Sequence, residues 1–289
     1  MTFIAQEESV ESAAPVELFR FASLEDTFTY TSGNVEVVFG GNTYVPRAIS
    51  RGEDQIESLD DQRRVVVKMP ATDPFVARYF ATLPAQPDVL TIYKRHTTDG
   101  PTPETVTVFR GKVANVAVEG NEAIVNALSD ASILQRTIPM QTTRNLCNHV
   151  LFDSRCKVVE TSFGMDVTIT GISADALVIS VSSSDTIPAT GNALSAQLTA
   201  DSTFFNGGTL ERSNLERRMV RSIADLGGNQ AQITVLLPFA SISVGSTFRL
   251  FAGCDHRFPT CSGKFSNETN YGGFPHVPRK NPFQSGLEV

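Results

Sequence analysis

The sequence predicts a mainly β protein with two or more barrel-like or sandwich-like domains, few helices, and a four-cysteine region that joins the domains. Apolar and polar residues alternate in most hydrophobic segments, which is typical of half-buried strands. Gly- and Ser-rich loops separate these segments, and 289 residues are enough for two cores. We expect an N-terminal β-rich domain over residues 1–139 and an inserted β-domain over residues 163–250. The cysteine region would comprise residues 140–162 and 251–289.

The alternation in the N-terminal domain predicts a curved sheet, in a barrel or a sandwich. Gly40-Gly41-Asn42 and Glu119-Gly120-Asn121 have the composition of tight hairpin turns between strands. The expected strands are residues 15–22, 35–39, 43–48, 63–69, 89–95, 105–120 and 122–128.

One helix is expected in this domain. Asp73 is a good N-cap, Pro74 suits the first turn, and the apolar pattern runs to Pro84. Phe75, Tyr79 and Leu83 recur at helical spacing and would form the face that packs on the sheet.

The second half continues as β structure, with one positively charged run between its strands. Residues 211–229 contain four arginines, which nearby glutamates and Asp225 offset. A solvated or subunit-facing surface is favoured over a nucleic-acid site for this run. The strands expected here are residues 165–172, 176–182, 232–238 and 246–253.

Charge and motifs exclude several classes of function. A net charge of −7 argues against a general nucleic-acid or membrane-surface binder. There is no phosphate-binding loop, dinucleotide fingerprint, HExxH motif or nucleophile elbow, so we expect no enzyme activity. The start of the sequence lacks the pattern of a secretory signal, and no segment approaches the roughly 20 apolar residues that span a bilayer. We therefore expect that the chain does not insert into a membrane. We also expect that it is made in the cytoplasm, where thiols stay reduced.

The four cysteines form two pairs, Cys147-x8-Cys156 and Cys254-x6-Cys261. Thiolates are the ligands of zinc and of iron–sulfur clusters, and both centres use about four. These spacings are longer than those of zinc knuckles. Structural zinc, an iron–sulfur cluster, and unligated buried thiols or disulfides all remain open from the cysteines alone.

The four histidines have different expected roles. His149 and His256 each follow a cysteine by two residues, so they could complete a mixed site, form nearby hydrogen bonds or face solvent. His276 lies among prolines and is expected to pack. His96, at a strand end, is expected to be exposed.

The C-terminal half resembles a known family. The run GCDHRFPTCSGKFSNETNYGGFPHVPRKNPF (253–283), the preceding ERRMVRSIADLGGN (216–229), and the first cysteine pair are similar to the tail-tip hub proteins of long-tailed phages. This family includes relatives of the lambda tail tip protein L and of gene transfer agents. The resemblance covers residues 140–289 closely and residues 1–139 more loosely.

The resemblance implies a structural virion protein at the tail tip, assembled in the host cytoplasm. It implies a [4Fe–4S] cluster, with zinc as the alternative, held by Cys147, Cys156, Cys254 and Cys261. A homotrimer would connect the distal tail or tube protein above to the central tip or fibre protein below, and DNA would pass through its lumen without specific binding. A zinc-stapled module of this architecture, or an iron–sulfur redox or DNA-processing enzyme, are the rival interpretations.

Two sets of residues would support such a cluster. Glycines would let the backbone approach the sulfurs and donate N–H bonds to them, and aromatic side chains would exclude water. The glycines are Gly253, Gly263, Gly272 and Gly273, and the aromatic residues are Phe258, Phe265, Tyr271 and Phe274.

Overall fold

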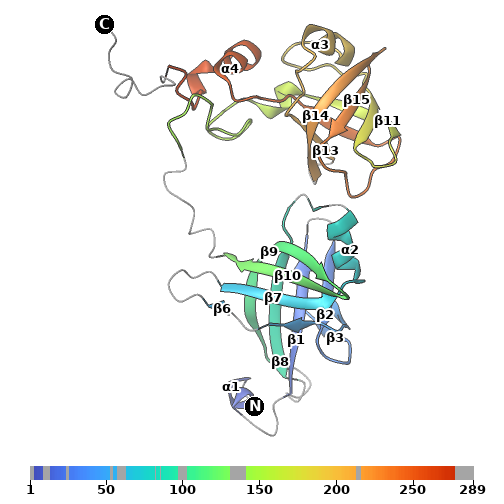
Figure 1. Ribbon diagram of the computed structural model, residues 1–289, viewed down its shortest axis with the longest axis vertical. Coiled ribbons are helices and arrows are strands. Elements are labelled where there is room, and N and C mark those ends of the chain that lie inside the picture. Colours follow the sequence, from blue (N-terminus) through green and yellow to red (C-terminus); the bar gives the residue numbers. More distant parts are fainter. Residues whose placement is uncertain are drawn as a thin grey trace. The chain divides into compact units, whose positions relative to one another are not determined.

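The computed structural model divides the chain into two compact units, Met1–Arg136 and Thr137–Val289 (Figure 1). Each unit has its own hydrophobic core, and strands dominate both, which confirms the predicted mainly β class. None of the described helices has the length and apolar character needed to cross a membrane. The described residues are 3–8, 14–23, 26–52, 55–56, 63–81, 83–84, 86–96, 103–130, 141–212 and 216–276.

The described strands of unit 1 form one ten-stranded sheet, in the order β3-β4-β2-β1-β8-β9-β10-β7-β5, with β6 also paired to β7. All pairings are antiparallel except β2 with β4. The two expected hairpins are present, and Gly40, Gly41 and Gly120 adopt the positive φ angles that their turns require. The strands are β1 Pro15–Ala22, β2 Thr27–Thr31, β3 Val37–Phe39, β4 Asn42–Pro46, β5 Ser50–Arg51, β6 Gln55–Ile56, β7 Arg63–Pro70, β8 Val89–His96, β9 Thr105–Glu119 and β10 Glu122–Ser129.

Helix α2 (Pro74–Ala81) packs on this sheet through the first part of the predicted face. The Asp73 carboxylate accepts a 2.9 Å hydrogen bond from the Phe75 amide, as a helix N-cap does. Phe75 is fully buried, and its ring lies 4.2 Å from that of Phe21. Leu83 was wrongly assigned to this face, because α2 ends before it and the residue is exposed.

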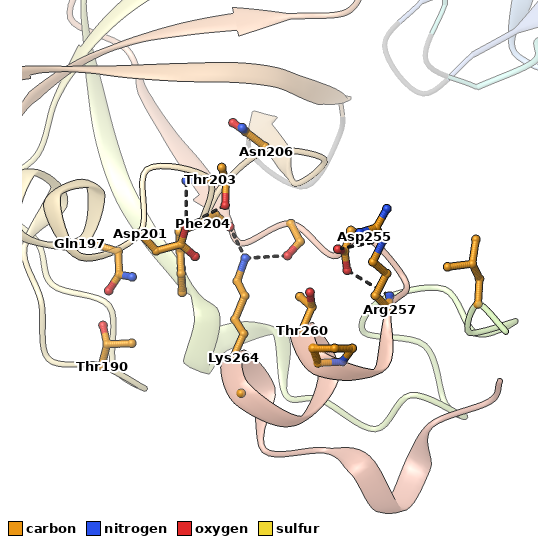
Figure 2. Close-up of a pocket in the computed structure, with 14 residues that line it drawn as sticks. Thr190, Gln197, Asp201, Thr203, Phe204, Asn206, Asp255, Arg257, Thr260 and Lys264 are labelled. Carbon is orange, nitrogen blue, oxygen red and sulfur yellow. Dashed lines mark hydrogen bonds and ion pairs between the residues drawn. The ribbon is translucent and has the colours of Figure 1, made fainter. Parts of the chain in front are cut away.

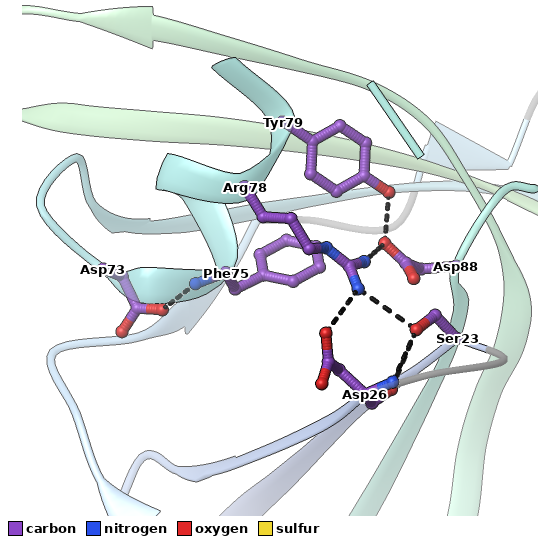
Figure 3. A network of polar contacts seen from close by, with 7 residues as sticks. All are labelled: Ser23, Asp26, Asp73, Phe75, Arg78, Tyr79 and Asp88. Carbon is purple, nitrogen blue, oxygen red and sulfur yellow. Dashed lines mark hydrogen bonds and ion pairs between the residues drawn. The ribbon is translucent and has the colours of Figure 1, made fainter. Parts of the chain in front are cut away.

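A polar network fixes α2 to the sheet (Figure 3). The Arg78 guanidinium pairs with the buried Asp88 carboxylate, lies 3.6 Å from Asp26, and donates a 3.1 Å hydrogen bond to Ser23. The Tyr79 hydroxyl donates a 2.5 Å hydrogen bond to the same Asp88 oxygen. Burial, followed by this hydrogen bond to the Asp88 carboxylate, raises the pKa of Tyr79 well above its ordinary range.

The prediction that His96 is exposed is wrong. Its side chain is 1 % exposed at the end of β8 and lies 2.8 Å from a carboxylate oxygen of Glu7. Glu7 belongs to the short helix α1 (Phe3–Glu7), which also stacks the Phe3 ring against His96. A segment far away in the sequence covers the histidine, so local pattern could not show its burial.

Unit 2 contains a closed six-stranded barrel in the order β11-β12-β15-β14-β13-β16. Every pairing in it is antiparallel. Helix α3 (Leu194–Ala200) contacts β14 and β15. The strands are β11 Gly164–Ile172, β12 Val178–Ser182, β13 Thr209–Arg212, β14 Glu216–Gly227, β15 Gln230–Val235 and β16 Thr247–Phe251.

The arginine run includes the end of β13 and the whole of β14, and its description as solvated is wrong in part. Arg221 is exposed, but Arg218 and Glu216 are both buried and form an ion pair of 2.5 Å. Arg217 bridges Glu160 and the buried Glu211 at 2.8 Å each. Charged residues that form ion pairs with one another in the barrel wall give a sequence of the same composition as a solvated surface.

Candidate metal centre

The four cysteines all lie in unit 2 and line one small cavity. The side chains of Cys147, Cys156 and Cys261 are buried, Cys254 is partly buried, and all four thiols are free. The centre is adjacent to the barrel, since Cys156 and Phe265 belong to the barrel's hydrophobic core cluster. The sequence therefore predicted a set of residues that the fold does bring together.

Direct hydrogen bonds join the two cysteine segments. The Cys147 amide donates to the His256 carbonyl at 2.8 Å, and the Asn267 side chain donates to the Cys156 carbonyl at 2.6 Å. The Asn148 side chain donates to the Gly272 carbonyl at 2.9 Å. The barrel lies between the two segments in the chain, so these bonds also hold its two ends together.

The loop of the first pair is shaped by Asp153. Its carboxylate accepts hydrogen bonds from the amides of Val150, Arg155 and Cys156, at 3.2, 2.9 and 2.5 Å. Burial acts to raise the pKa of Asp153, but these backbone donors outweigh it and hold the pKa below its ordinary value. A single side chain thus closes the turn that places Cys156.

The second pair is positioned by helix α4 (Phe258–Phe265), which carries Cys261 and contains Pro259 in its first turn. The helix stops at Ser266, which is left-handed (φ 48°) and whose amide donates back to the Ser262 carbonyl at 3.0 Å. Cys254 precedes the helix, in the loop that leaves β16. Gly263 and the short length of the helix give it little intrinsic stability, so it depends on packing.

The sulfurs receive backbone donors in the same way in both pairs. The His149 amide contacts Cys147 Sγ at 3.4 Å, and the His256 amide contacts Cys254 Sγ at 3.3 Å. The Gly272 amide adds a second donor to Cys147 Sγ at 3.2 Å. Donors of this kind stabilise a sulfur that carries negative charge. The donor set and its surroundings therefore fit a thiolate-ligated centre.

The thiols also perturb one another. Burial, followed by the charges of the other three cysteines, raises the pKa of Cys261 to about 11. Burial likewise raises the pKa of Cys254, although the His256 amide opposes this. A cation bound in the cavity would compensate the charge that deprotonation of Cys254 and Cys261 creates.

Of the four glycines singled out in the sequence, only Gly272 donates to a sulfur among the hydrogen bonds of the described residues. A Cβ on it would lie 2.5 Å from the His149 ring, and one on Gly273 would lie 2.7 Å from the Leu146 carbonyl. Gly253 is also crowded, but by the backbone of Asn206. A Cβ on Gly263 would meet nothing within 4 Å, so that position has no steric need for glycine.

The four aromatic residues singled out in the sequence also differ in whether they line the cavity. Phe265 and Tyr271 line the cavity of the cysteines. Phe258 packs edge-on against Tyr271, with ring centres 5.2 Å apart, and Phe274 is 52 % exposed. Phe274 therefore does not shield the centre as expected.

The histidines next to the cysteines line the cavity, and His149 Nδ1 lies 3.1 Å from the Asn270 carbonyl oxygen. His276 is exposed rather than packed, so that expectation is wrong. Within the part of the chain that the structure describes, no group of three or more His, Cys, Asp or Glu side chains has the geometry to hold a metal ion. Residues 277–289 of the predicted cysteine region lie outside the described residues.

A wider groove lies beside the centre, and sequence analysis missed its main residue, Lys264 (Figure 2). The groove runs between α4 and the loop that follows α3, and Asp201, Asp255 and Arg257 also line it. Burial lowers the pKa of Lys264 to about 8, against the charges of Asp201, Cys254 and Asp255. A lone lysine in a polar stretch carries no sequence signal for burial.

Two family models match parts of the chain, and a solved structure shares its fold. The model for the baseplate hub protein, N-terminal attachment domain, matches residues 89–159, and that for the phage conserved hypothetical protein BR0599 matches residues 203–281. A chain of the solved structure "Virion of native gene transfer agent (GTA) particle" matches with a TM-score of 0.76 and 16 % identity, over 100 % of this chain and 96 % of that one. No curated protein matches significantly. The two phage family matches confirm the resemblance that the sequence indicated, and the solved structure shows a shared fold.

Proposed function

We propose that the chain is a structural tail-tip hub of a phage-type particle, with no enzymatic role. The observation that carries this proposal is the fold, which matches a chain of a gene transfer agent virion over its full length. The family model for a baseplate hub attachment domain supports the same role. Both matches agree with the expected localisation to a virion.

The proposed hub is a homotrimer in the particle. It contacts the distal tail or tube protein on one side and the central tip or fibre protein on the other, and its ring surrounds the path of the DNA. The net charge of −7 supports passage without adhesion, because an acidic surface repels the phosphate backbone. Among the described strands, β3, β5 and β6 lie at the borders of the unit 1 sheet and are candidates for contacts with neighbouring subunits.

We further propose that Cys147, Cys156, Cys254 and Cys261 hold a [4Fe–4S] cluster. All four thiols line one cavity, and three backbone amides donate to their sulfurs. A cluster places its thiolate ligands around several iron atoms, so the ligands surround a volume rather than meet at one point. When bound, the cluster would supply covalent links between the two segments that flank the barrel.

Single Cys→Ser variants test the cluster. A serine hydroxyl is a much poorer ligand than a thiolate, so each of the four variants should lose most of its iron and sulfide after anaerobic purification. Ser262→Ala, next to Cys261 on α4, is the matched control and should keep both. Full iron content in all four cysteine variants would rule the ligand set out.

The hub role is tested in the particle itself. A lysate in which the chain is deleted should contain DNA-filled heads without tails, because a tail tip is required before the tube can grow on it. Electron microscopy of the lysate distinguishes this outcome from particles with normal, infectious tails, which would exclude an essential hub role. A Cys147→Ser lysate then shows whether assembly needs the cysteine centre.

A further inference from the structure

Lys264 joins three segments of unit 2 through one ammonium group (Figure 2). Its Nζ donates hydrogen bonds to the carbonyl of Phe204 and, at 2.7 Å, to the carbonyl of Gly253. The ammonium also lies 4.2 Å from the centre of the Phe204 ring and 5.3 Å from that of Phe265. These contacts account for the partial burial of a lysine that a polar stretch would be expected to expose.

The three segments are those that position the second cysteine pair. Lys264 lies on α4, one turn beyond Cys261, and Gly253 immediately precedes Cys254. Phe204 belongs to the barrel loop between α3 and β13, and its carbonyl also accepts the Gly253 amide at 3.0 Å. A Cβ on Gly253 would lie 1.9 Å from the Asn206 carbonyl, so the chain before Cys254 passes directly against this loop.

An apolar side chain could have filled this space without the cost of burying a charge. An ammonium is retained in such a place only where acceptors and aromatic faces compensate for lost water. The two carbonyls and two rings provide that compensation. They also place one positive charge on the side of α4 that faces the barrel, next to the cysteine centre, where thiolate ligands would add negative charge.

We propose that Lys264 is a positioning residue for the cysteine centre, which fixes Cys254 and Cys261 against the barrel and provides a compensating charge beside the cluster. Only the charge effect in this inference rests on the proposed cluster. The positioning effect follows from contacts that the protein makes without any cofactor. The two parts are therefore separable by experiment.

The test compares Lys264→Met and Lys264→Arg with wild type, and uses Lys112→Met on β9 as a control for the loss of an exposed lysine. Methionine keeps the length and the aromatic contacts but has no charge and no N–H donors. Loss of a charged hydrogen bond should speed amide hydrogen exchange in residues 253–265 at least about tenfold. Arginine keeps the charge and should restore part of the protection.

Iron-loaded protein gives the second readout. Lys264→Met should release iron to a chelator faster than wild type, and the reduction potential of its cluster should move to more negative values because a nearby positive charge is lost. Lys264→Arg should keep the wild-type potential. A structural role without charge compensation would leave the potential of Lys264→Met unchanged, which would overturn that part of the proposal.

The outcomes distinguish this inference from the proposed function. Wild-type exchange and iron retention in Lys264→Met would overturn the positioning role and leave the cluster intact. If the wild-type protein contains no iron and Lys264→Met still shows faster amide exchange, the cluster and the charge role are rejected. The positioning role is then supported.

Discussion

The amide of Cys147 donates a 2.8 Å hydrogen bond to the carbonyl of His256, two residues after Cys254. This bond joins the two cysteine segments directly, and the whole barrel lies between its ends in the sequence. Closing so long a loop costs conformational entropy, which a cofactor bound by both segments would offset. The hydrogen bonds hold the two segments together, and in the proposed cluster the four thiols would provide the ligands.

Gly272→Ala should disrupt the centre. The added methyl group would lie 2.5 Å from the His149 ring, in a segment whose backbone also donates to Cys147 Sγ. Overpacking of this kind costs about 1–3 kcal/mol of unfolding free energy. Chemical denaturation and iron content measure the effect.

Gly263→Ala is the control, because a methyl group there meets nothing and lies within α4. Alanine should leave iron content unchanged and stabilise the helix by about 0.5–1 kcal/mol. Equal effects of the two variants would show that the crowding around Gly272 does not matter.

Asp153→Ala should loosen the loop of the first pair, because three backbone amides lose their common acceptor. We expect a loss of about 1–2 kcal/mol and faster iron release, with Asp153→Asn intermediate. Asp175 accepts the Leu177 amide in a barrel turn between β11 and β12. Asp175→Ala should therefore keep the wild-type rate of iron release. A wild-type rate of release in Asp153→Ala would contradict the role assigned to Asp153.

In unit 1, Asp88→Ala should cost about 3–5 kcal/mol, because it leaves the half-buried Arg78 guanidinium and the Tyr79 hydroxyl without their shared acceptor. Glu122→Ala breaks an exposed ion pair with Lys68, 3.9 Å long, and should change stability by less than about 1 kcal/mol. Urea denaturation of the two variants gives the comparison. A small effect of Asp88→Ala would mean that α2 does not depend on this network.

The docking of α1 on the rest of unit 1 should weaken at acidic pH. Hydrogen bonding to Lys94 lowers the pKa of Glu7, burial opposes this, and His96 lowers it further. A lowered pKa in the folded state means that the carboxylate stabilises docking above the ordinary value of 4.5 and loses this effect as the pH falls through the folded value. Amide exchange of residues 3–8, followed by NMR from about pH 6 to about pH 3, should show α1 detaching in acid. Glu7→Gln should abolish this pH dependence, and a persistent acid transition in that variant would refute it.

Alternation predicted most of the fold, and it failed where charges are buried. Pro15–Ala22 was predicted to the residue because its apolar side chains pack into the core, whereas β14 was not, since Glu216 and Arg218 pair with each other inside the protein. Helix α4 was missed because it is short and Gly263 weakens it locally, and tertiary contacts such as those of Lys264 hold it.

The cysteine spacing pointed to four residues that the fold brings together around one cavity, but it could not show their surroundings. The contribution of Gly272 could be anticipated from its place in a Gly-rich loop after the second pair. Asp153 and Asn267 could not, because each acts through backbone groups whose positions only the folded chain defines. Segments distant in sequence bury His96 and partly bury Lys264, so no local pattern indicates either.

Metal and sulfide analysis of the anaerobically purified full chain tests the central claim most directly. The account predicts a brown protein that contains iron and acid-labile sulfide in near-equal amounts, about four of each per chain, with broad absorption in the blue part of the visible spectrum. A colourless protein that contains stoichiometric zinc and no sulfide would contradict the cluster and support a zinc-stapled module instead.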